Sequence, residues 1–183
     1  IKLTEIGFEV LAIDKDKRKI SLLRNRILPF AKEEPNLLEK FKKASASQKL
    51  TFSSTSSGVS TSRTIFICVD TPIEKDKPDY SSLISALKSV AKYFKKGTII
   101  VIESTVSPLT TKNLIIPTLE KESKLLVNKD FFVAVVPERI RPNYIFKQLT
   151  TLSRVIGVSS KKIQPPLTKI YSQITSGNLN FVD

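Results

Sequence analysis

The sequence predicts an α/β fold with a mostly parallel sheet and helices on both faces. Three apolar runs carry this prediction, and each ends in polar residues: TIFICVDTP at 64–72, TIIVIESTVSP at 98–108 and VAVVPERIRPN at 133–143. Apolar, β-branched runs of this length are typical of strands that are buried on both faces of a parallel sheet. Since the carboxyl ends of such strands meet at one edge, the polar residues after the three runs are expected to line one functional cleft.

The start of the chain predicts a helix followed by a strand. Residues 1–6 have helical spacing and stop at Gly7, which suits the left-handed position after a helix. A strand is expected at 8–13, ending at Asp14, and a helix at 15–25.

The next stretch predicts a second helix and a second strand. The apolar positions Leu37, Leu38, Phe41 and Ala44 mark one helix face, and residues 49–52 are expected to form a short strand. The Ser- and Thr-rich segment 45–62 could be a linker. Because strands flank it closely, we expect a polar connection with one short helix, followed by a strand at 65–69.

Strands and helices alternate through the remainder of the chain. We expect a loop at 73–79, a helix at 80–94, a strand at 98–102, a helix at 109–119, a strand at 131–136, a short helix at 145–149, a strand at 154–157, a helix at 161–174 and a strand at 178–182. This alternation predicts parallel strands joined by helices, within a single domain over residues 1–183.

Composition limits the function classes. With 40% hydrophobic and 26% charged residues, the chain has the composition of a globular domain. It contains no apolar run long enough to span a bilayer and no signal peptide, so a cytoplasmic location is expected. One cysteine and no histidine exclude a disulfide framework, the usual zinc sites and histidine-based triads. The cysteine, Cys68, lies inside an apolar run and is expected to be a buried core thiol, not a nucleophile.

The net charge of +13 has two interpretations. The lysines are dispersed along the chain, and no aromatic residues interleave with them as stacking platforms for bases. We therefore expect solvated helix faces that attract anionic nucleotides. A basic nucleotide- or nucleic-acid-binding module is the alternative.

Four motifs resemble one known family. They are VLAIDKDKRKI, IFICVDTPIEKDKPD, KKGTIIVIESTVSPLTT and VPERIRPN, in this order over nearly all 183 residues. The chain resembles the nucleotide-sugar dehydrogenases, which use NAD to oxidise the C6 hydroxyl of a UDP-hexose or UDP-N-acetylhexosamine to a uronate. The PER in the last motif resembles the UDP-N-acetylmannosamine branch more than the UDP-glucose branch. The resemblance implies a Rossmann-like NAD-binding domain and a UDP-sugar substrate.

The resemblance also implies a set of cofactor-binding residues. Asp14 would accept hydrogen bonds from the adenosine ribose, and Lys19 would lie near the same adenosine. Asp14 could also be the N-cap of the following helix. The other residues expected at the cofactor are Val69, Thr71, Pro72, Ser104 and Thr105.

Catalytic and substrate-binding roles follow from the same resemblance. Glu138 would activate the water that hydrolyses a cysteine-bound thioester, and Thr105 would help to hold that water and the transferring sugar oxygen. Arg139 and Arg141 would bind the diphosphate or a carboxylate, since a guanidinium suits bidentate contacts with oxygen. Ordinary surface charge is the alternative for both arginines, and pairing with a neighbouring arginine is the alternative for Glu138.

The sequence departs from the family pattern at both ends. It contains no GxGxxG turn, so the first strand and the phosphate loop are expected to be missing. The family's nucleophilic cysteine and the lysine and asparagine of its central helix would lie beyond residue 183. We therefore expect no activity from the chain alone, and NAD binding in the millimolar range at best. The chain could be a fragment whose remainder is on another chain or was cut away, a degenerate remnant, or a nucleotide-binding module.

The missing strand has a structural consequence. In the order 3-2-1-4-5-6 it would lie between the strands at 8–13 and 65–69. Unpaired strand edges are costly where water is excluded. These two strands are therefore predicted to pair directly or to gain a strand from another chain, including a second copy of this one.

Overall fold

A five-stranded sheet forms the centre of the computed structural model, which describes residues 1–29, 36–140 and 144–183. Its strands, in spatial order, are β3 (Thr64–Ile67), β6 (Ile99–Ile102), β7 (Phe132–Val135), β8 (Arg154–Val158) and β9 (Leu179–Val182). All neighbouring strands are parallel except β7 and β8, which are antiparallel. The predicted mostly parallel sheet is confirmed.

The first part of the chain forms a separate two-stranded parallel sheet, β1 (Val10–Ile13) and β2 (Leu50–Ser53). Three helices accompany it: α1 (Lys2–Glu5), α2 (Lys17–Arg24) and α3 (Leu37–Ala46). Val10, Ala12 and Phe52 of the sheet pack with Phe41 and Ala44 of α3 in a small core of their own.

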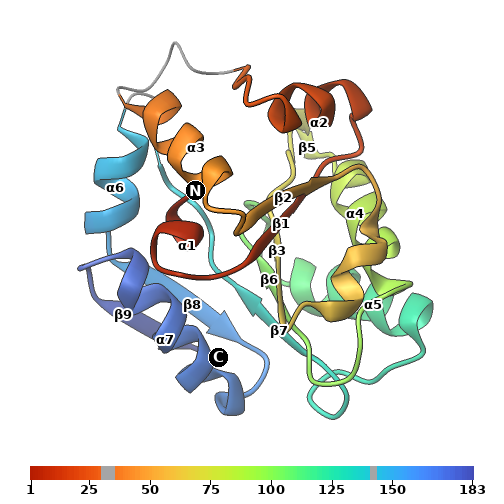
Figure 1. Ribbon diagram of the computed structural model, residues 1–183. Helices are drawn as coiled ribbons and strands as arrows, with labels where there is room; N and C mark the ends of the chain where they lie inside the picture. Colours follow the sequence, from red (N-terminus) through yellow and green to blue (C-terminus); the bar gives the residue numbers. More distant parts are fainter. Residues whose placement is uncertain (30–35, 141–143) are drawn as a thin grey trace.

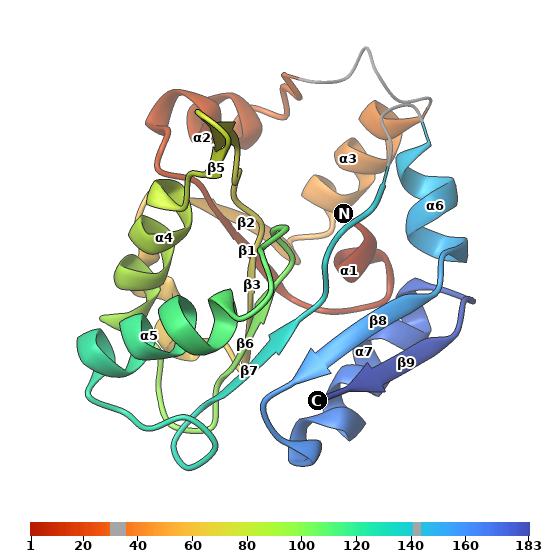
Figure 2. The ribbon, with the colours of Figure 1, turned by 180° about the vertical axis from the view of Figure 1, so that it is seen from behind.

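Helices cover both faces of the large sheet, as predicted (Figures 1 and 2). One face is covered by α4 (Ser81–Ala91), the π-helical turn η2 (Thr111–Ile115) and α5 (Ile116–Ser123), and the other by the 3-10 turn η3 (Lys161–Ile163) and α7 (Gln164–Ile174). The remaining helices are the 3-10 turn η1 (Ser56–Thr61), which precedes β3, and α6 (Ile145–Thr151). None of the described helices is both long and apolar enough to cross a bilayer.

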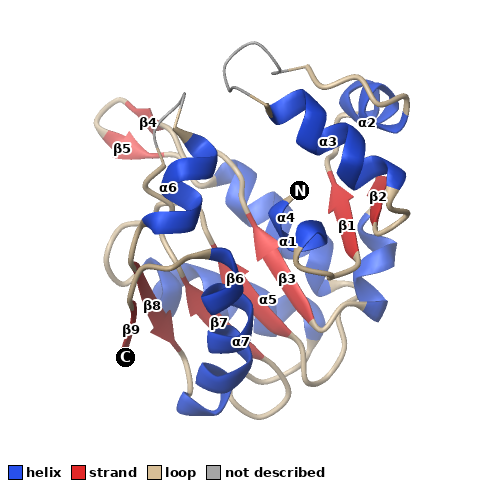
Figure 3. Cartoon of the chain, turned by 60° about the vertical axis from the view of Figure 1, so that its left-hand side comes forward, coloured by secondary structure: helices blue, strands red, loops and turns tan. Residues whose placement is uncertain are grey.

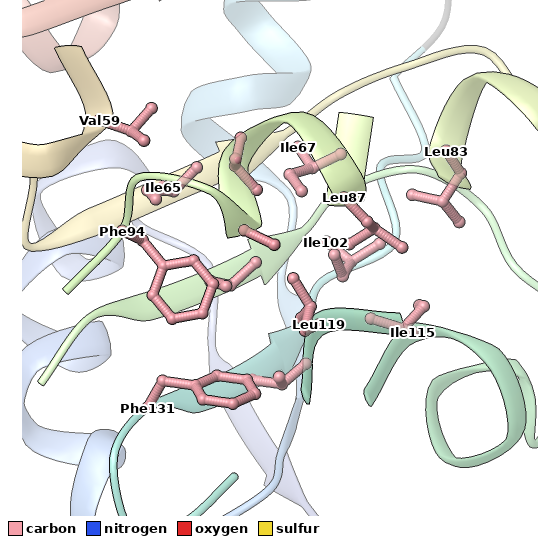
Figure 4. Close-up of a cluster of buried hydrophobic side chains, with 14 residues drawn as sticks. Val59, Ile65, Ile67, Leu83, Leu87, Phe94, Ile102, Ile115, Leu119 and Phe131 are labelled. Atoms are coloured by element: carbon pink, nitrogen blue, oxygen red, sulfur yellow. The ribbon is translucent and has the colours of Figure 1, made fainter. Parts of the chain in front are cut away.

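The central strand β6 shows why this sequence builds two cores. Successive side chains of a strand point to opposite faces. Ile102 packs against α4 and α5 (Figure 4). Ile100 belongs to the same cluster, whereas Ile99 and Val101 pack against α7. Every residue of the run IIVI is therefore buried, which explains its continuous apolar character.

Two local predictions need correction. The loop expected at 73–79 contains a small hairpin, β4 (Ile73–Glu74) and β5 (Lys77–Pro78). Its two turn residues, Lys75 and Asp76, both have positive φ, which a two-residue turn of this kind requires. The helix expected at 109–119 begins as the π-helical turn η2 and continues to Ser123.

The predicted direct pairing of the first and third strands is wrong. β1 and β3 belong to separate sheets and share no strand pairing in the described part of the chain (Figure 3). Packing holds the first unit in its place. Leu3, Ile6 and Phe8 pack against the core of the large sheet, and Leu11 lies so close to Gly58 that an added Cβ there would be 2.3 Å from it. A strand supplied by another chain stays a prediction.

Candidate functional site

The carboxyl ends of β3, β6 and β7 meet at one edge of the large sheet, as the sequence predicts. Ile67, Ile102 and Val135 lie side by side at the end of the strand register. The backbone pairing continues past them, since the N–H of Glu103 donates to the oxygen of Ile67 (2.9 Å) and the N–H of Glu138 to that of Glu103 (3.1 Å).

Side-chain hydrogen bonds join the loops after β3 and β6. The Ser104 hydroxyl is buried, donates to the carbonyl of Val69 (2.7 Å) and accepts from the N–H of Val69 (2.9 Å). The Thr71 hydroxyl donates to the carbonyl of Thr105 (2.7 Å). Four predicted cofactor residues are thus brought together, and Ser104 acts as a clamp between the loops. Thr105 is exposed, and its hydroxyl forms no hydrogen bond with the described residues. Pro72, next to Thr71, is also exposed.

Asp14 follows β1 and forms an ion pair with Lys19, with 2.5 Å between Oδ2 and Nζ. Its other carboxylate oxygen accepts from the N–H of Asp16 (3.0 Å). Partial burial pushes the pKa of Asp14 upward, but the Lys19 hydrogen bond, the Asp16 N–H and the charges of Lys19 and Lys15 outweigh it and hold the pKa below its ordinary value. Asp14 is therefore ionised near neutral pH, as an acceptor for ribose hydroxyls must be.

The alternative of Asp14 as a helix cap is wrong. The N-cap of α2 is Asp16, whose carboxylate accepts from the N–H groups of Arg18 (2.8 Å) and Lys19 (3.1 Å). This leaves Asp14 outside the helix, at the carboxyl end of its strand.

Glu138 does pair with an arginine, but the partner comes from another strand. Both of its carboxylate oxygens accept from Nη1 of Arg154 (3.1 and 3.0 Å), and Arg154, the first residue of β8, is 3% exposed. The guanidinium of Arg139 donates to the carbonyl of Ser153 (3.0 Å) instead of extending freely into solvent. Arg141 lies outside the described residues.

The half-buried Glu103 and the buried Tyr171 form a second polar pair. The Tyr171 hydroxyl, on α7, donates to Oε1 of Glu103. Burial raises the pKa of Glu103, assisted by the charge of Glu138 and opposed by Tyr171 and Arg154. Burial and the carboxylate of Glu103 raise the pKa of Tyr171. Neither residue was among the predicted site residues.

Cys68 is exposed, so its predicted place in the core is wrong. β3 is an edge strand of the large sheet in the described part of the chain, and it ends at Ile67. Cys68 therefore lies just beyond the strand, although the apolar run that suggested burial continues to Val69. Desolvation by the surrounding protein, together with the charges of Glu103 and Glu138, nevertheless raises the pKa of the thiol to about 12. The raised pKa favours the protonated thiol near neutral pH, and the expectation that Cys68 is not a nucleophile stays a prediction.

The raised pKa of Glu103 predicts a pH-dependent stability. A folded carboxyl that holds its proton more tightly than the unfolded chain makes the protein lose stability as pH rises from about 4.3, the ordinary pKa of glutamate, through the folded value. Glu103→Gln has no charge to bury, so its unfolding free energy should lack this loss and exceed that of the original chain near neutral pH. Urea denaturation across this range measures the difference. An identical pH slope in both proteins would contradict the prediction.

The site residues after β1 and those after β3, β6 and β7 all lie at the carboxyl ends of parallel strands. An ionised aspartate follows a parallel strand, and polar loops follow three further parallel strands of a sheet that is covered by helices on both faces. These features define a nucleotide-binding domain of the Rossmann-like class. The family model for the NAD binding domain of the UDP-glucose/GDP-mannose dehydrogenase family matches residues 1–175, and the chain belongs to this family.

Curated relatives include UDP-N-acetyl-D-mannosamine dehydrogenases from Pyrococcus horikoshii, 31% identical over 98% of this chain, and from Methanococcus maripaludis, 34% identical over 99%. Among solved structures, the UDP-D-ManNAc dehydrogenase of Pyrococcus horikoshii has a TM-score of 0.93 and 30% identity over the whole chain. A ternary complex of a GDP-mannose dehydrogenase from Pseudomonas aeruginosa has a TM-score of 0.91 and 26% identity over 98% of the chain. In each of these comparisons the chain spans 40 to 43% of the length of the protein it matches.

Proposed function

We propose that residues 1–183 form one NAD-binding domain of a UDP-sugar 6-dehydrogenase. The reaction would convert UDP-N-acetyl-D-mannosamine or UDP-glucose to the uronate and reduce two NAD. The observation that carries this proposal is the ionised Asp14, paired with Lys19 at the end of a parallel strand in a member of this family. The chain's own residues fit the adenosine half of NAD, because Asp14 is partly exposed and has lone pairs left for ribose hydroxyls.

In this proposal the loops after β3 and β6 hold the rest of the cofactor. Val69, Thr71 and Pro72 would line its ribose, with Ser104 and Thr105 on the neighbouring loop. The bonds between Ser104 and Val69 and between Thr71 and Thr105 keep the two loops in register, so the cofactor would meet a preformed surface. Bound NAD would supply the hydride acceptor.

The sugar would be handled at the end of β7. Glu138 would activate water near the sugar C6, and Thr105, whose hydroxyl is unpaired among the described residues, would hold that water and the sugar oxygen. Arg154 holds the Glu138 carboxylate, since its Nη1 donates to both oxygens. Arg139 and Arg141 would reach the UDP diphosphate or a carboxylate.

The proposed partners are a UDP-sugar and, in addition, either the remaining part of a dehydrogenase or a second copy of this chain. We also propose a cytoplasmic location, because NAD and UDP-sugars are supplied there.

NAD titration tests the cofactor assignment. The 183-residue chain has no glycine-rich turn to bind the pyrophosphate, so we expect a dissociation constant in the millimolar range. In a two-dimensional NMR titration, the largest shifts should fall on Asp14, Lys19 and Thr71. Asp14→Asn should weaken binding about tenfold, the loss of one charge-assisted hydrogen bond.

The control for this titration is Glu39→Gln, which removes an equivalent carboxylate from the exposed Lys43 pair on α3. It should leave NAD binding unchanged. A dissociation constant in the low micromolar range, or equal losses in both variants, would contradict the assignment.

A further inference from the structure

A second polar hollow lies at the opposite edge of the large sheet. It is formed by residues 60–63, the end of η1 and the two residues before β3, and by residues 95–98, between α4 and β6, and has a volume of about 410 Å³. Thr64 of β3 pairs with Ile99 of β6 at the amino ends of these strands. The cofactor loops follow the carboxyl ends of the same two strands, so the hollow is separate from the proposed dehydrogenase site.

The hollow is lined by positive charges without a lining carboxylate. Arg63, Lys95 and Lys96 line it. Lys96 pairs with Asp130 at 2.9 Å, but its side chain is still 72% exposed. Arg63 and Lys95 have no ion pair with any residue in the described ranges. The guanidinium of Arg63 and the ammonium group of Lys95 are therefore available to an anion here.

Of the four hydroxyl groups that line the hollow, that of Thr61 donates to the carbonyl of Gly58 (3.1 Å), and the other three have no such partner among the described residues. Those of Ser60, Ser62 and Thr98 form no hydrogen bond within the described part of the chain, and Thr98 is only 3% exposed. Thr98 lines the hollow, and its hydroxyl is not among the fully buried unpaired groups, so water or a ligand can reach it there.

The backbone holds the two turns in fixed positions. The N–H of Ile99 donates to the carbonyl of Arg63 (2.9 Å), and the N–H of Gly97 donates to that of Asp130 (2.6 Å). Gly97 has a φ of +87°, a conformation that favours glycine. The cations and hydroxyls are thus presented on a rigid sheet edge, and binding requires little ordering of the backbone.

These groups point to one ligand chemistry. Unpaired cations and hydroxyl donors suit an anion with several oxygens, and a hollow of this volume is larger than a single phosphate needs. No aromatic side chain lines it to stack on a base. We propose that the hollow binds a compact, multiply charged phosphate anion such as pyrophosphate.

Titration calorimetry of the 183-residue chain with sodium pyrophosphate tests this proposal. Saturable binding is expected, with NMR shifts on residues 60–63 and 95–98. Arg63→Gln and Lys95→Gln should each weaken binding about tenfold, which corresponds to about 1.4 kcal/mol. Thr98→Val, which removes the hydroxyl and keeps the shape, should weaken it by a smaller factor.

Lys161→Gln is the matched control, because it lowers the net charge by the same amount at an exposed position on η3, outside the hollow. Thermal melts of all variants establish that they fold. Equal effects of Arg63→Gln and Lys161→Gln would show that binding depends only on the net charge of the chain and would overturn the proposal. The absence of any binding would overturn it as well.

Two further outcomes identify other binding modes. Shifts centred on Asp14 and Thr71 would mean that pyrophosphate occupies the proposed cofactor site, and the hollow would then be rejected while the dehydrogenase assignment stands. A short DNA duplex that binds more tightly than pyrophosphate and loses affinity in Lys95→Gln would identify a nucleic-acid surface instead. Steep weakening with salt would accompany that outcome.

Discussion

The 183-residue chain is expected to produce no NADH when it is supplied with NAD and either UDP-glucose or UDP-N-acetyl-D-mannosamine. The reaction that the family resemblance implies passes through a cysteine-bound thioester. Cys68 is the chain's one cysteine, and the raised pKa of its thiol disfavours the thiolate that a nucleophile requires. NAD should also bind weakly, because no glycine-rich turn is available for its pyrophosphate.

A coupled absorbance assay at saturating NAD measures this result. A full-length UDP-sugar dehydrogenase, such as the relative from Pyrococcus horikoshii, serves as the positive control. Steady turnover by the chain would show that its own residues complete the site. Loss of such turnover in Cys68→Ser would then identify Cys68 as a nucleophile and overturn the argument from its pKa.

Replacing Glu138 by alanine is expected to destabilise the domain by about 3 kcal/mol. Arg154 is 3% exposed, and its Nε already has no hydrogen-bond partner among the residues that the structure describes. Without the Glu138 carboxylate the buried guanidinium would lose its ion pair and keep, among the described residues, one hydrogen bond, from Nη2 to the carbonyl of Leu149 (3.3 Å). We place the loss at the lower end of the range for buried pairs, because the Glu138 side chain is 31% exposed and water can replace part of it.

The midpoint and slope of urea denaturation measure this loss. Glu138→Gln keeps an oxygen acceptor for Arg154 and should cost clearly less than Glu138→Ala. Glu39→Ala removes a carboxylate from an exposed pair within α3 and should leave the midpoint unchanged. If Glu138→Ala and Glu39→Ala behave alike, Arg154 does not depend on Glu138 for its burial.

Much of the fold could be predicted because its local signals agree with one another. The run IIVI is buried on both faces, and the residues that cover it recur at helical spacing in α4 and α7. The cofactor residues could be predicted only through their motifs, since Asp14 and Thr105 follow strands as many other polar residues do. The cofactor-binding roles of Asp14 and Thr105 therefore remain proposals.

Residues that act through distant partners could not be predicted from their own position. Arg154 looks like an ordinary polar residue at the start of a strand, and Tyr171 like one apolar position on a helix. A charge directly next to the apolar run VIGV was the one available signal for Arg154. Its partner is 16 residues away, and that of Tyr171 is 68 residues away.

The sequence by itself determined the order of strands and helices, the family, and the strand ends at which the polar loops lie. Hydrophobic periodicity and short motifs carry this information, because they depend on neighbouring residues. Only the tertiary structure decided that β1 and β3 remain in separate sheets, that Glu138 is bound to Arg154 and that Arg63 and Lys95 share one hollow. Each of these depends on packing between residues far apart in the chain, where burial and charge act through space and leave no pattern of fixed spacing.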